Sequence, residues 1–204
     1  MEFNFKYFLN PEKYAVILGK SECDICHKVK ECFDGSVYYG EEEFGAFCFE
    51  CVSKGRLREV GAFSCDSDVK SFKEQLKQIN KDLTDKDIER IKNELTDQLN
   101  YSTPKIPTWQ DWLWPCHCGD YCQFISLAGK EDFNQLAEDK NGKDLFKESL
   151  NYRIKDRIIE NRDLDNVWND LKNEHIKINE EYSPMAYIFR CFVCKKIITE
   201  WDCD

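Results

Sequence analysis

Closely spaced pairs of cysteines constrain this sequence more than any other feature. The chain has twelve cysteines, and most of them fall into four short motifs. These are Cys23 with Cys26, Cys48 with Cys51, Cys118 with Cys122, and Cys191 with Cys194. Such spacings let two sulfurs reach one ion, and Zn²⁺ takes four ligands in a tetrahedron. Disulfides do not require repeated doublets, although disulfides or an iron–sulfur cluster remain alternatives. The pattern predicts two bound zinc ions.

The first four cysteines are expected to share one ion. Cys23 and Cys26 lie in a predicted tight turn, and paired strand pieces follow it. Cys48 and Cys51 come where a short helix could begin, and the free backbone N–H groups of a helix start can donate to sulfur. A turn, a hairpin and a helix that carries the second pair describe a treble-clef-like zinc finger. His27 is redundant to four thiolates, so we expect it at the surface or behind the ligands.

The second group is expected to join distant parts of the chain. The pair Cys191 and Cys194 has only the cluster around "CHCGDYC" as a partner, about seventy residues earlier. Adjacent side chains of an extended chain diverge, so the three residues "CHC" cannot easily all face one ion. We therefore predict Cys118 and Cys122 as the other two ligands and leave out Cys116. Replacement of one cysteine by His117 is the main alternative.

Two charged stretches, 67–100 and 131–181, are predicted to be helical. In the first, Thr84 is a candidate N-cap and apolar residues follow at spacings of three and four, so a helical hairpin should turn near 80–84. In the second, apolar residues recur from Leu145 to Leu171, with a break expected around 161–165. The predicted fold class is α+β, with cysteine-rich, treble-clef-like zinc-finger elements and inserted helical hairpins. The predicted units are 1–65, 66–103 and 104–204, the last with a helical insert at 131–181.

Charge and composition limit the kinds of partner and the cellular compartment that we expect for this chain. The formal charge is −10 and 33% of the residues are charged. Proteins that bind duplex DNA normally show a basic patch or stripe, so we expect no nucleic-acid partner. The first residues lack a basic segment followed by an apolar run, and no stretch approaches the roughly 18 apolar residues that span a membrane. A cytoplasmic protein with no membrane association is expected.

The sequence offers little for catalysis. It contains no H-E-x-x-H, no phosphate-binding glycine-rich loop and no G-x-S-x-G. The chain has three histidines in total, which makes a histidine-based zinc hydrolase hard to build. Four thiolates also fill the coordination shell that a catalytic zinc keeps partly open. We therefore expect that the protein is not an enzyme.

Several stretches resemble the CbrC family of bacterial proteins, one of which is linked by name to colicin tolerance. They are "FKYFLNP", the first two C-x-x-C pairs, "TPKIPTWQDWLWPCHCGDYCQF" and "YIFRCFVCKKIITEWDCD". The stretches 67–100 and 131–181 look longer than the pattern of that family. The resemblance supports the paired cysteines, implies a role in toxin tolerance or immunity, and brings no catalytic residues.

An acidic protein steers basic partners, and a nuclease toxin must itself be basic to hold phosphate. The first hypothesis is therefore a cytosolic zinc-binding protein of the immunity type that binds a basic protein partner. The candidate contact residues are Asp163, Asp165 and Asp170, on the polar side of the second charged stretch. The alternatives are a zinc-stabilised regulatory or adaptor module and an uncharacterised metal-dependent enzyme.

Overall fold

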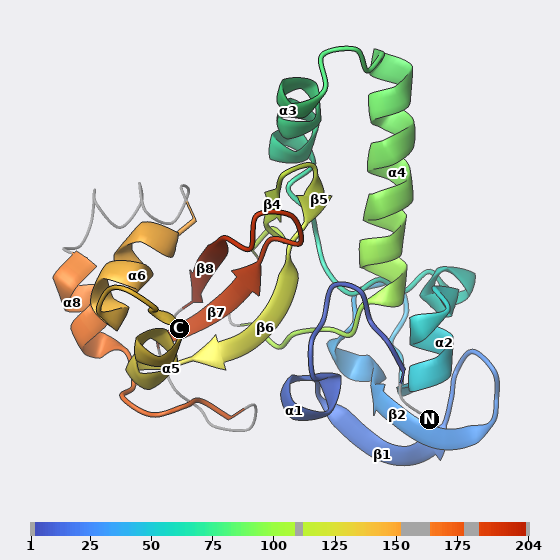
Figure 1. The fold of residues 1–204 in the computed structure, drawn as a ribbon. Coiled ribbons are helices and arrows are strands. Elements are labelled where there is room, and N and C mark those ends of the chain that lie inside the picture. The colour runs from blue at the N-terminus through green and yellow to red at the C-terminus, as the bar shows by residue number, and fades with distance from the viewer. Residues whose placement is uncertain (1–2, 109–111, 152–163, 178–183, 203–204) are drawn as a thin grey trace.

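The computed structural model describes residues 3–108, 112–151, 164–177 and 184–202 (Figure 1). The first half begins with the short helix α1 (Pro11–Tyr14) and an antiparallel sheet of β1 (Ile17–Glu22), β2 (Val29–Asp34) and β3 (Ala46–Cys48). The 3-10 turn η1 (Gly35–Val37) follows β2. Helix α2 (Phe49–Ser53) and the 3-10 turn η2 (Arg56–Val60) follow β3. Turn, strands and helix follow in the predicted order, but the strand that pairs with β3 is β2, before η1, and not a piece of the loop between η1 and β3.

A helical hairpin stands out from the rest of the molecule in Figure 1. Helix α3 (Val69–Ile79) and helix α4 (Asp85–Ser102) pack against each other. The α4 N-terminus is a capping box, because the Thr84 hydroxyl accepts from the Asp87 N–H while the Asp87 carboxylate accepts from the Thr84 N–H, both at 3.2 Å. The predicted hairpin and its turn are confirmed. Both arms contact the β4–β5 pair, α3 through β4 and α4 through β5, and α4 also contacts α2 and η2.

The second half contains a two-stranded hairpin and a second antiparallel sheet. Strands β4 (Cys116–His117) and β5 (Asp120–Tyr121) form the hairpin. Strands β6 (Gln123–Ala128), β7 (Met185–Arg190) and β8 (Ile197–Asp202) form the sheet in that order. Because side chains alternate across a strand, β7 contributes to two cores. Tyr187 and Phe189 face the main core, while Ala186 and Ile188 face a smaller one.

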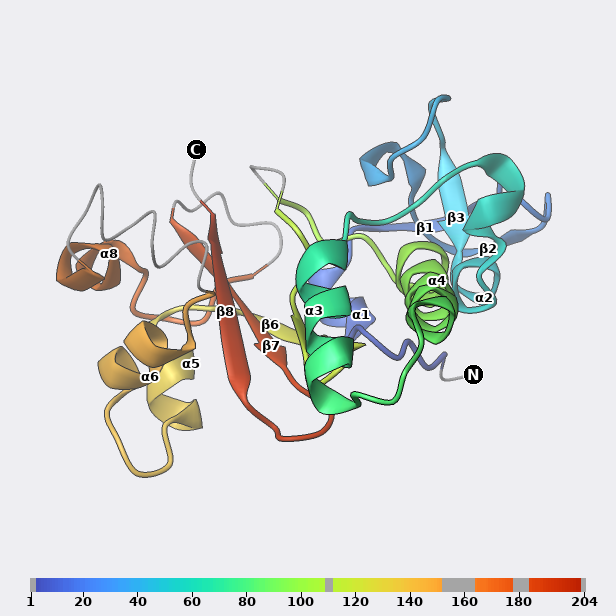
Figure 2. The same cartoon turned by 90° about the horizontal axis from the view of Figure 1, so that it is seen from above.

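Helices from the second charged stretch cover the smaller core. They are α5 (Lys130–Leu136), α6 (Gly142–Ser149) and α8 (Leu164–Asp170). The end of α6 differs from the expected longer helix, because Leu150 leaves it to form a parallel bridge with Thr199 of β8. Seen from above, these helices and the first sheet lie at opposite ends, with the second sheet and α3 between them (Figure 2).

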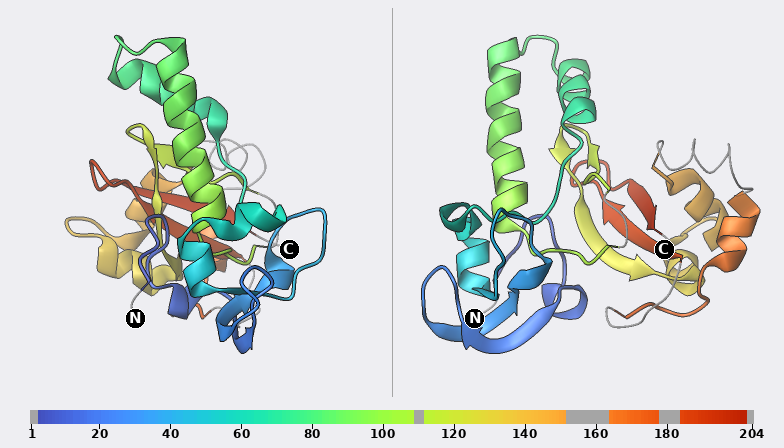
Figure 3. Two further views of the ribbon diagram at one scale, coloured as in Figure 1. Left: turned by 90° about the vertical axis from the view of Figure 1, so that its right-hand side faces the viewer. Right: turned by 180° about the vertical axis from the view of Figure 1, so that it is seen from behind.

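The mixed α+β class is confirmed, together with its two zinc-finger-like elements. The division into units at residues 65 and 103 stays a prediction. None of the described helices is long and apolar enough to cross a membrane. The views in Figure 3 show the α3–α4 hairpin beside both sheets, so it lies against both halves of the protein in space. Along the chain, the hairpin lies between the two cysteine clusters.

Candidate metal centres

The first group of candidate ligands is the predicted one. The sulfurs of Cys23, Cys26, Cys48 and Cys51 all lie within 4.8 Å of one another. The turn between β1 and β2 supplies the first pair. The second pair comes from the last residue of β3 and from helix α2. The four side chains could hold one metal ion, as the spacing predicts.

Backbone hydrogen bonds fix the turn that carries Cys23 and Cys26. The Cys23 N–H donates to the Lys28 carbonyl at 3.1 Å, and the His27 N–H donates to the Cys23 carbonyl at 2.8 Å. His27 closes the turn in the left-handed region, with φ of 54°. Its side chain is exposed and is not among the grouped ligands, in agreement with the expectation that it is redundant.

The turn between β7 and β8 repeats this geometry around Cys191. Here the Cys191 N–H donates to the Lys196 carbonyl at 3.0 Å, and the Lys195 N–H donates to the Cys191 carbonyl at 3.2 Å. Lys195 has φ of 61° and occupies the position of His27. The two C-x-x-C turns therefore share one backbone design, and each presents two sulfurs on the same side.

Hydrogen-bond donors and cations surround the first group. Burial by itself raises the pKa of Cys23, but backbone N–H groups, first that of Cys48, donate to its sulfur and bring the pKa down to about 7. The Cys48 N–H lies 3.3 Å from the Cys23 sulfur. The Arg56 guanidinium donates to the Cys51 sulfur at 3.4 Å. These donors favour the thiolate form that binds metal, while burial raises the pKa of the Cys48 and Cys51 thiols.

The second group consists of His117, Cys118, Cys191 and Cys194, whose ligand atoms also lie within 4.8 Å of one another. The His117 Nδ1 lies 3.2 Å from the Cys118 sulfur and 3.3 Å from the Cys194 sulfur. His117 belongs to β4, Cys118 to the turn before β5, and the other two to the turn between β7 and β8. The structure thus joins the middle of the chain to its C-terminal strands, as predicted.

The structure groups His117, rather than the predicted Cys122, with Cys118, Cys191 and Cys194, which is the alternative that the sequence left open. The argument that adjacent side chains diverge applies to extended backbone. Cys118, however, has φ of 54° and Gly119 has φ of 76°, so the chain reverses there. In that reversal His117 and Cys118 face the same ion position. The "CHCG" stretch held the signal, since two residues with positive φ, the second a glycine, form the tight turns of hairpins.

The two neighbouring cysteines belong to the core instead. Cys122 is fully buried, its N–H donates to the Pro115 carbonyl, and its own carbonyl accepts from the Trp114 indole at 2.7 Å. Burial raises the pKa of its thiol. Cys116 packs against α3, where the Gln75 amide donates to its carbonyl at 3.0 Å. Leaving Cys116 out of the ligand set agrees with its absence from the group among the residues described.

The imidazole of His117 suits a metal ligand. Burial and, to a smaller extent, the nearby Lys196 ammonium lower the pKa of His117, which favours the neutral ring that binds metal. The Cys194 thiol has a lowered pKa because the Lys196 N–H donates to it. Cys194 is also the exposed member of the group, whereas Cys191 is buried.

Residues of the N-terminal segment contact the β4–β5 hairpin. Lys6 forms an ion pair with Asp120 at 2.9 Å, and the buried Tyr7 hydroxyl donates to the same carboxylate at 2.8 Å. Asp120 pairs with His117 across the hairpin. The Lys6 ammonium also lies 5.8 Å from the centre of the Phe192 ring, in the turn that carries Cys191. These contacts help to position the β4–β5 hairpin and the β7–β8 turn, which carry the two halves of the second group.

The donor chemistry of both groups suits a thiophilic divalent ion. One group offers four sulfurs, and the other offers three sulfurs and one imidazole nitrogen. These are the ligand sets of structural zinc sites. None of the eleven cysteines that the structure describes forms a disulfide. Both groups could therefore hold a metal ion, in a manner consistent with zinc.

The three acidic residues predicted to contact a partner have different settings. Asp163 lies outside the described residues. Asp165 forms ion pairs with Lys143 and Lys147, both at 2.6 Å, and hydrogen bonds from these lysines lower its pKa to about 2. Asp170 is exposed at the end of α8. Much of the negative charge of Asp165 is thus matched within the protein.

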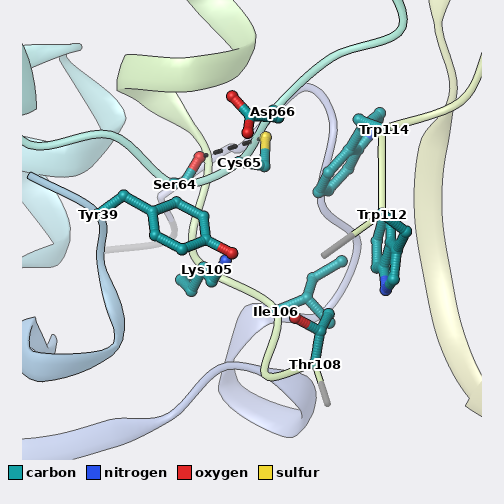
Figure 4. Close-up of a pocket in the computed structure, with 9 residues that line it drawn as sticks. All are labelled: Tyr39, Ser64, Cys65, Asp66, Lys105, Ile106, Thr108, Trp112 and Trp114. Atoms are coloured by element: carbon teal, nitrogen blue, oxygen red, sulfur yellow. Dashed lines mark hydrogen bonds between the residues drawn. The ribbon is translucent and has the colours of Figure 1, made fainter. Parts of the chain in front are cut away.

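The tryptophans near the second group form packing contacts. Trp112 lies 5.3 Å from Tyr187 and 5.6 Å from Phe189 between ring centres, and Trp114 is buried. Trp112 and Trp114 form one wall of a small cavity, and Tyr39 and Lys105 lie across it (Figure 4). The Lys105 ammonium lies 3.6 Å from the centre of the Tyr39 ring. The cavity measures about 20 Å³, room for a single water.

Comparisons with known proteins place the chain in a family. No solved structure matches it. The resemblance to CbrC proteins, which is more specific than the family match given next, stays a prediction. The model of one family, described as "Uncharacterised protein family (UPF0167)", matches residues 3–203, which is nearly the whole sequence. The chain therefore belongs to the uncharacterised protein family UPF0167.

Proposed function

We propose that this chain is a cytoplasmic zinc-binding protein whose two ions stabilise its fold, and that it acts by binding a basic protein partner, as toxin-tolerance and immunity proteins do. The observation that carries the proposal is the number of ligands. Each group brings four ligand atoms together from two separate segments. Four protein ligands close a tetrahedral shell, which is typical of structural rather than catalytic zinc.

Each ion would join separate segments of the chain. The first would join the β1–β2 turn to β3 and α2, and the second would join the β4–β5 hairpin to the β7–β8 turn. The binding free energy of a structural zinc is folding free energy, because the unfolded chain has no preformed site. The ions would therefore stabilise the fold, and the binding of a partner is assigned to residues at the protein surface.

Charge supports a protein partner of basic character. The chain carries 39 acidic and 29 basic residues, giving a formal charge of −10. Complementary charge mainly accelerates association and makes it depend on salt. The toxin-tolerance character of the proposal rests on the resemblance to CbrC proteins, and a regulatory or adaptor role is the alternative.

The test is affinity capture from native cells with the zinc-loaded protein as bait. The variant Asp163→Lys/Asp170→Lys reverses two of the candidate contact residues and spares Asp165, which holds Lys143 and Lys147. The control Glu41→Lys/Glu42→Lys changes net charge equally at exposed positions of the loop before β3. That loop connects η1 to β3 of the first sheet, which lies at the opposite end of the molecule from α8 (Figure 2).

The proposal predicts capture of a basic protein whose association slows as salt rises. The Asp163→Lys/Asp170→Lys variant should retain its zinc and capture less, and the control should capture as much as the wild type. Equal capture by all three proteins would remove α8 from the interface. A captured set without any basic protein would overturn the immunity-type role and leave the adaptor role.

A further inference from the structure

The two C-x-x-C turns share a backbone design but differ in their exposure to solvent. In the turn between β1 and β2, Ile25 precedes Cys26 and is only 9% exposed, because it packs in the main core. In the turn between β7 and β8, Val193 holds the same place before Cys194 and is 68% exposed. The tip of the first turn is therefore packed against the protein, whereas the tip of the second extends into solvent.

Hydrogen bonds from the two turns show the same contrast. The Asp24 carboxylate in the first turn accepts from the N–H groups of Gly45 and Ala46, at 2.7 and 3.2 Å. These bonds fasten the first turn to the start of β3. In the second turn the Lys195 ammonium donates to the Phe192 carbonyl at 2.7 Å, which is a contact within the turn itself.

The ligand sulfurs differ in the same way between the two groups. In the first group three cysteines are buried and the fourth is partly buried. In the second group Cys191 is buried, Cys118 is partly buried and Cys194 is exposed. Oxidants attack cysteines that have thiolate character and are accessible to solvent. A metal-bound sulfur has thiolate character, so Cys194 is the ligand that an oxidant in solution reaches first.

A second sulfur lies where it can react with an oxidised Cys194. The sulfurs of Cys118 and Cys194 lie within 4.8 Å of each other, and the His117 Nδ1 is 3.2 Å from one and 3.3 Å from the other. Figure 1 shows the β7–β8 turn beside the β4–β5 hairpin that carries Cys118. Cys191 is less accessible, because it is buried and its sulfur donates to the His117 carbonyl at 3.6 Å. Cys118 is thus the better placed partner.

We propose that the second metal group is an oxidation site for peroxides, at which Cys194 and Cys118 form a disulfide and release the metal ion. The Cys194 thiolate first attacks hydrogen peroxide, so that an S–O bond forms, the O–O bond breaks and hydroxide leaves. The Cys118 thiolate then attacks the same sulfur, so that the S–S bond forms and a second hydroxide leaves. Two thiolates are oxidised by one electron each, and one peroxide is reduced to two hydroxides, which two protons convert to water.

This inference rests on the proposed binding of two zinc ions and adds a difference between them. After oxidation, His117 and Cys191 are the two remaining ligands of the second group, and a structural zinc site needs four. The new disulfide joins the same two segments that the ion joined, so the β4–β5 hairpin stays attached to the β7–β8 turn. The first group should keep its ion, because its sulfurs are less accessible.

The experiment treats the full-length, zinc-loaded protein with hydrogen peroxide in the presence of a chromogenic zinc chelator. About one of the two ions should be released, and peptide mapping after differential alkylation should show a disulfide between Cys118 and Cys194. Brief treatment in the presence of dimedone, which traps sulfenic acids, should label Cys194 before any other cysteine.

Two variants separate this site from general oxidation of the protein. Cys194→His replaces the exposed sulfur by another zinc ligand, so it should keep two ions and release the second at least about tenfold more slowly than the wild type. Cys26→His makes the same change at the matching position of the first turn, and it should release the second ion within about twofold of the wild-type rate. Zinc content is measured first, and if Cys194→His holds only one ion, the dimedone labelling of the wild type decides.

Equal release from both groups would overturn the proposal. So would a first sulfenic acid on a cysteine other than Cys194, or a disulfide of Cys194 that does not include Cys118. Each of these results leaves the binding of two zinc ions standing. Fewer than two ions in the untreated protein would instead count against the proposed function itself, and the protein-capture experiment is independent of both outcomes.

Discussion

A single histidine distinguishes the second metal group from a simple extension of the cysteine pattern. His117 completes that group, while Cys122 is fully buried and accepts from the Trp114 indole through its carbonyl. The ligand set of a zinc site depends on which atoms the backbone brings together. Here the backbone does so through a turn with two residues of positive φ.

Substitution of His117 and of Cys122, one at a time, should show which of the two is a metal ligand and which is a core residue. His117→Ala removes one of four ligands, so the second ion should be lost to a moderate chelator and the zinc content should fall from about two to about one per chain. Cys122→Ala should keep both ions and lose only about 1 kcal/mol of stability through a small cavity. Zinc content after dialysis against the chelator decides the matter. Loss of an ion from Cys122→Ala and not from His117→Ala would restore the original assignment.

The sequence predicted the ligands unevenly, and the reason is local geometry. C-x-x-C turns have a stereotyped backbone, so Cys23, Cys26, Cys191 and Cys194 could be placed by spacing alone. The choice between His117 and Cys122 depended on the positive φ of Cys118, which the cysteine itself does not reveal and for which the following Gly119 is the sequence signal. The prediction therefore took Cys122 as a ligand and kept His117 as the alternative, whereas the structure groups His117 with the other ligands.

At the scale of elements, local signals predicted the α3–α4 hairpin and failed where tertiary contacts decide. Thr84 caps α4 with a hydrogen bond that its own sequence neighbours supply. Helix α6 instead stops at Ser149, because the next residue bridges to Thr199 and the Ser149 hydroxyl lies 2.7 Å from that of Thr199. An apolar period cannot show that competition from a distant strand.

The docking of α5 gives a prediction at this scale. A Cβ at Gly129 would collide with the carbonyl oxygen of Glu174 and lie 2.7 Å from that of Lys172. Gly129→Ala should therefore lower the free energy of unfolding by about 1–3 kcal/mol, as overpacking does. Gly45→Ala is the matched control, because its Cβ would approach no closer than 3.7 Å to the Asp24 carboxylate. The measurement is the free energy of unfolding of both variants from denaturant titrations with equal m-values. Equal stability of the two variants would refute the tight packing at Gly129.

For the whole molecule, the second ion should act as a joint between segments far apart in the chain. Cys191→Ser should raise hydrogen exchange in the β7–β8 turn and also in the β4–β5 hairpin, because both hold the same ion. Cys23→Ser is the control and should loosen the first sheet instead. If Cys191→Ser affects only the C-terminal strands, the two halves do not share a metal.

The central claim is that the chain holds two zinc ions with seven sulfur ligands and one nitrogen ligand between them. Zinc content combined with zinc-edge X-ray absorption on protein purified without added metal tests this directly. The account predicts about two zinc ions per chain, with sulfur at about 2.3 Å and a minor nitrogen shell at about 2.0–2.1 Å. A pure sulfur shell would contradict the role of His117, and protein without zinc whose cysteines are paired in disulfides would contradict the account as a whole.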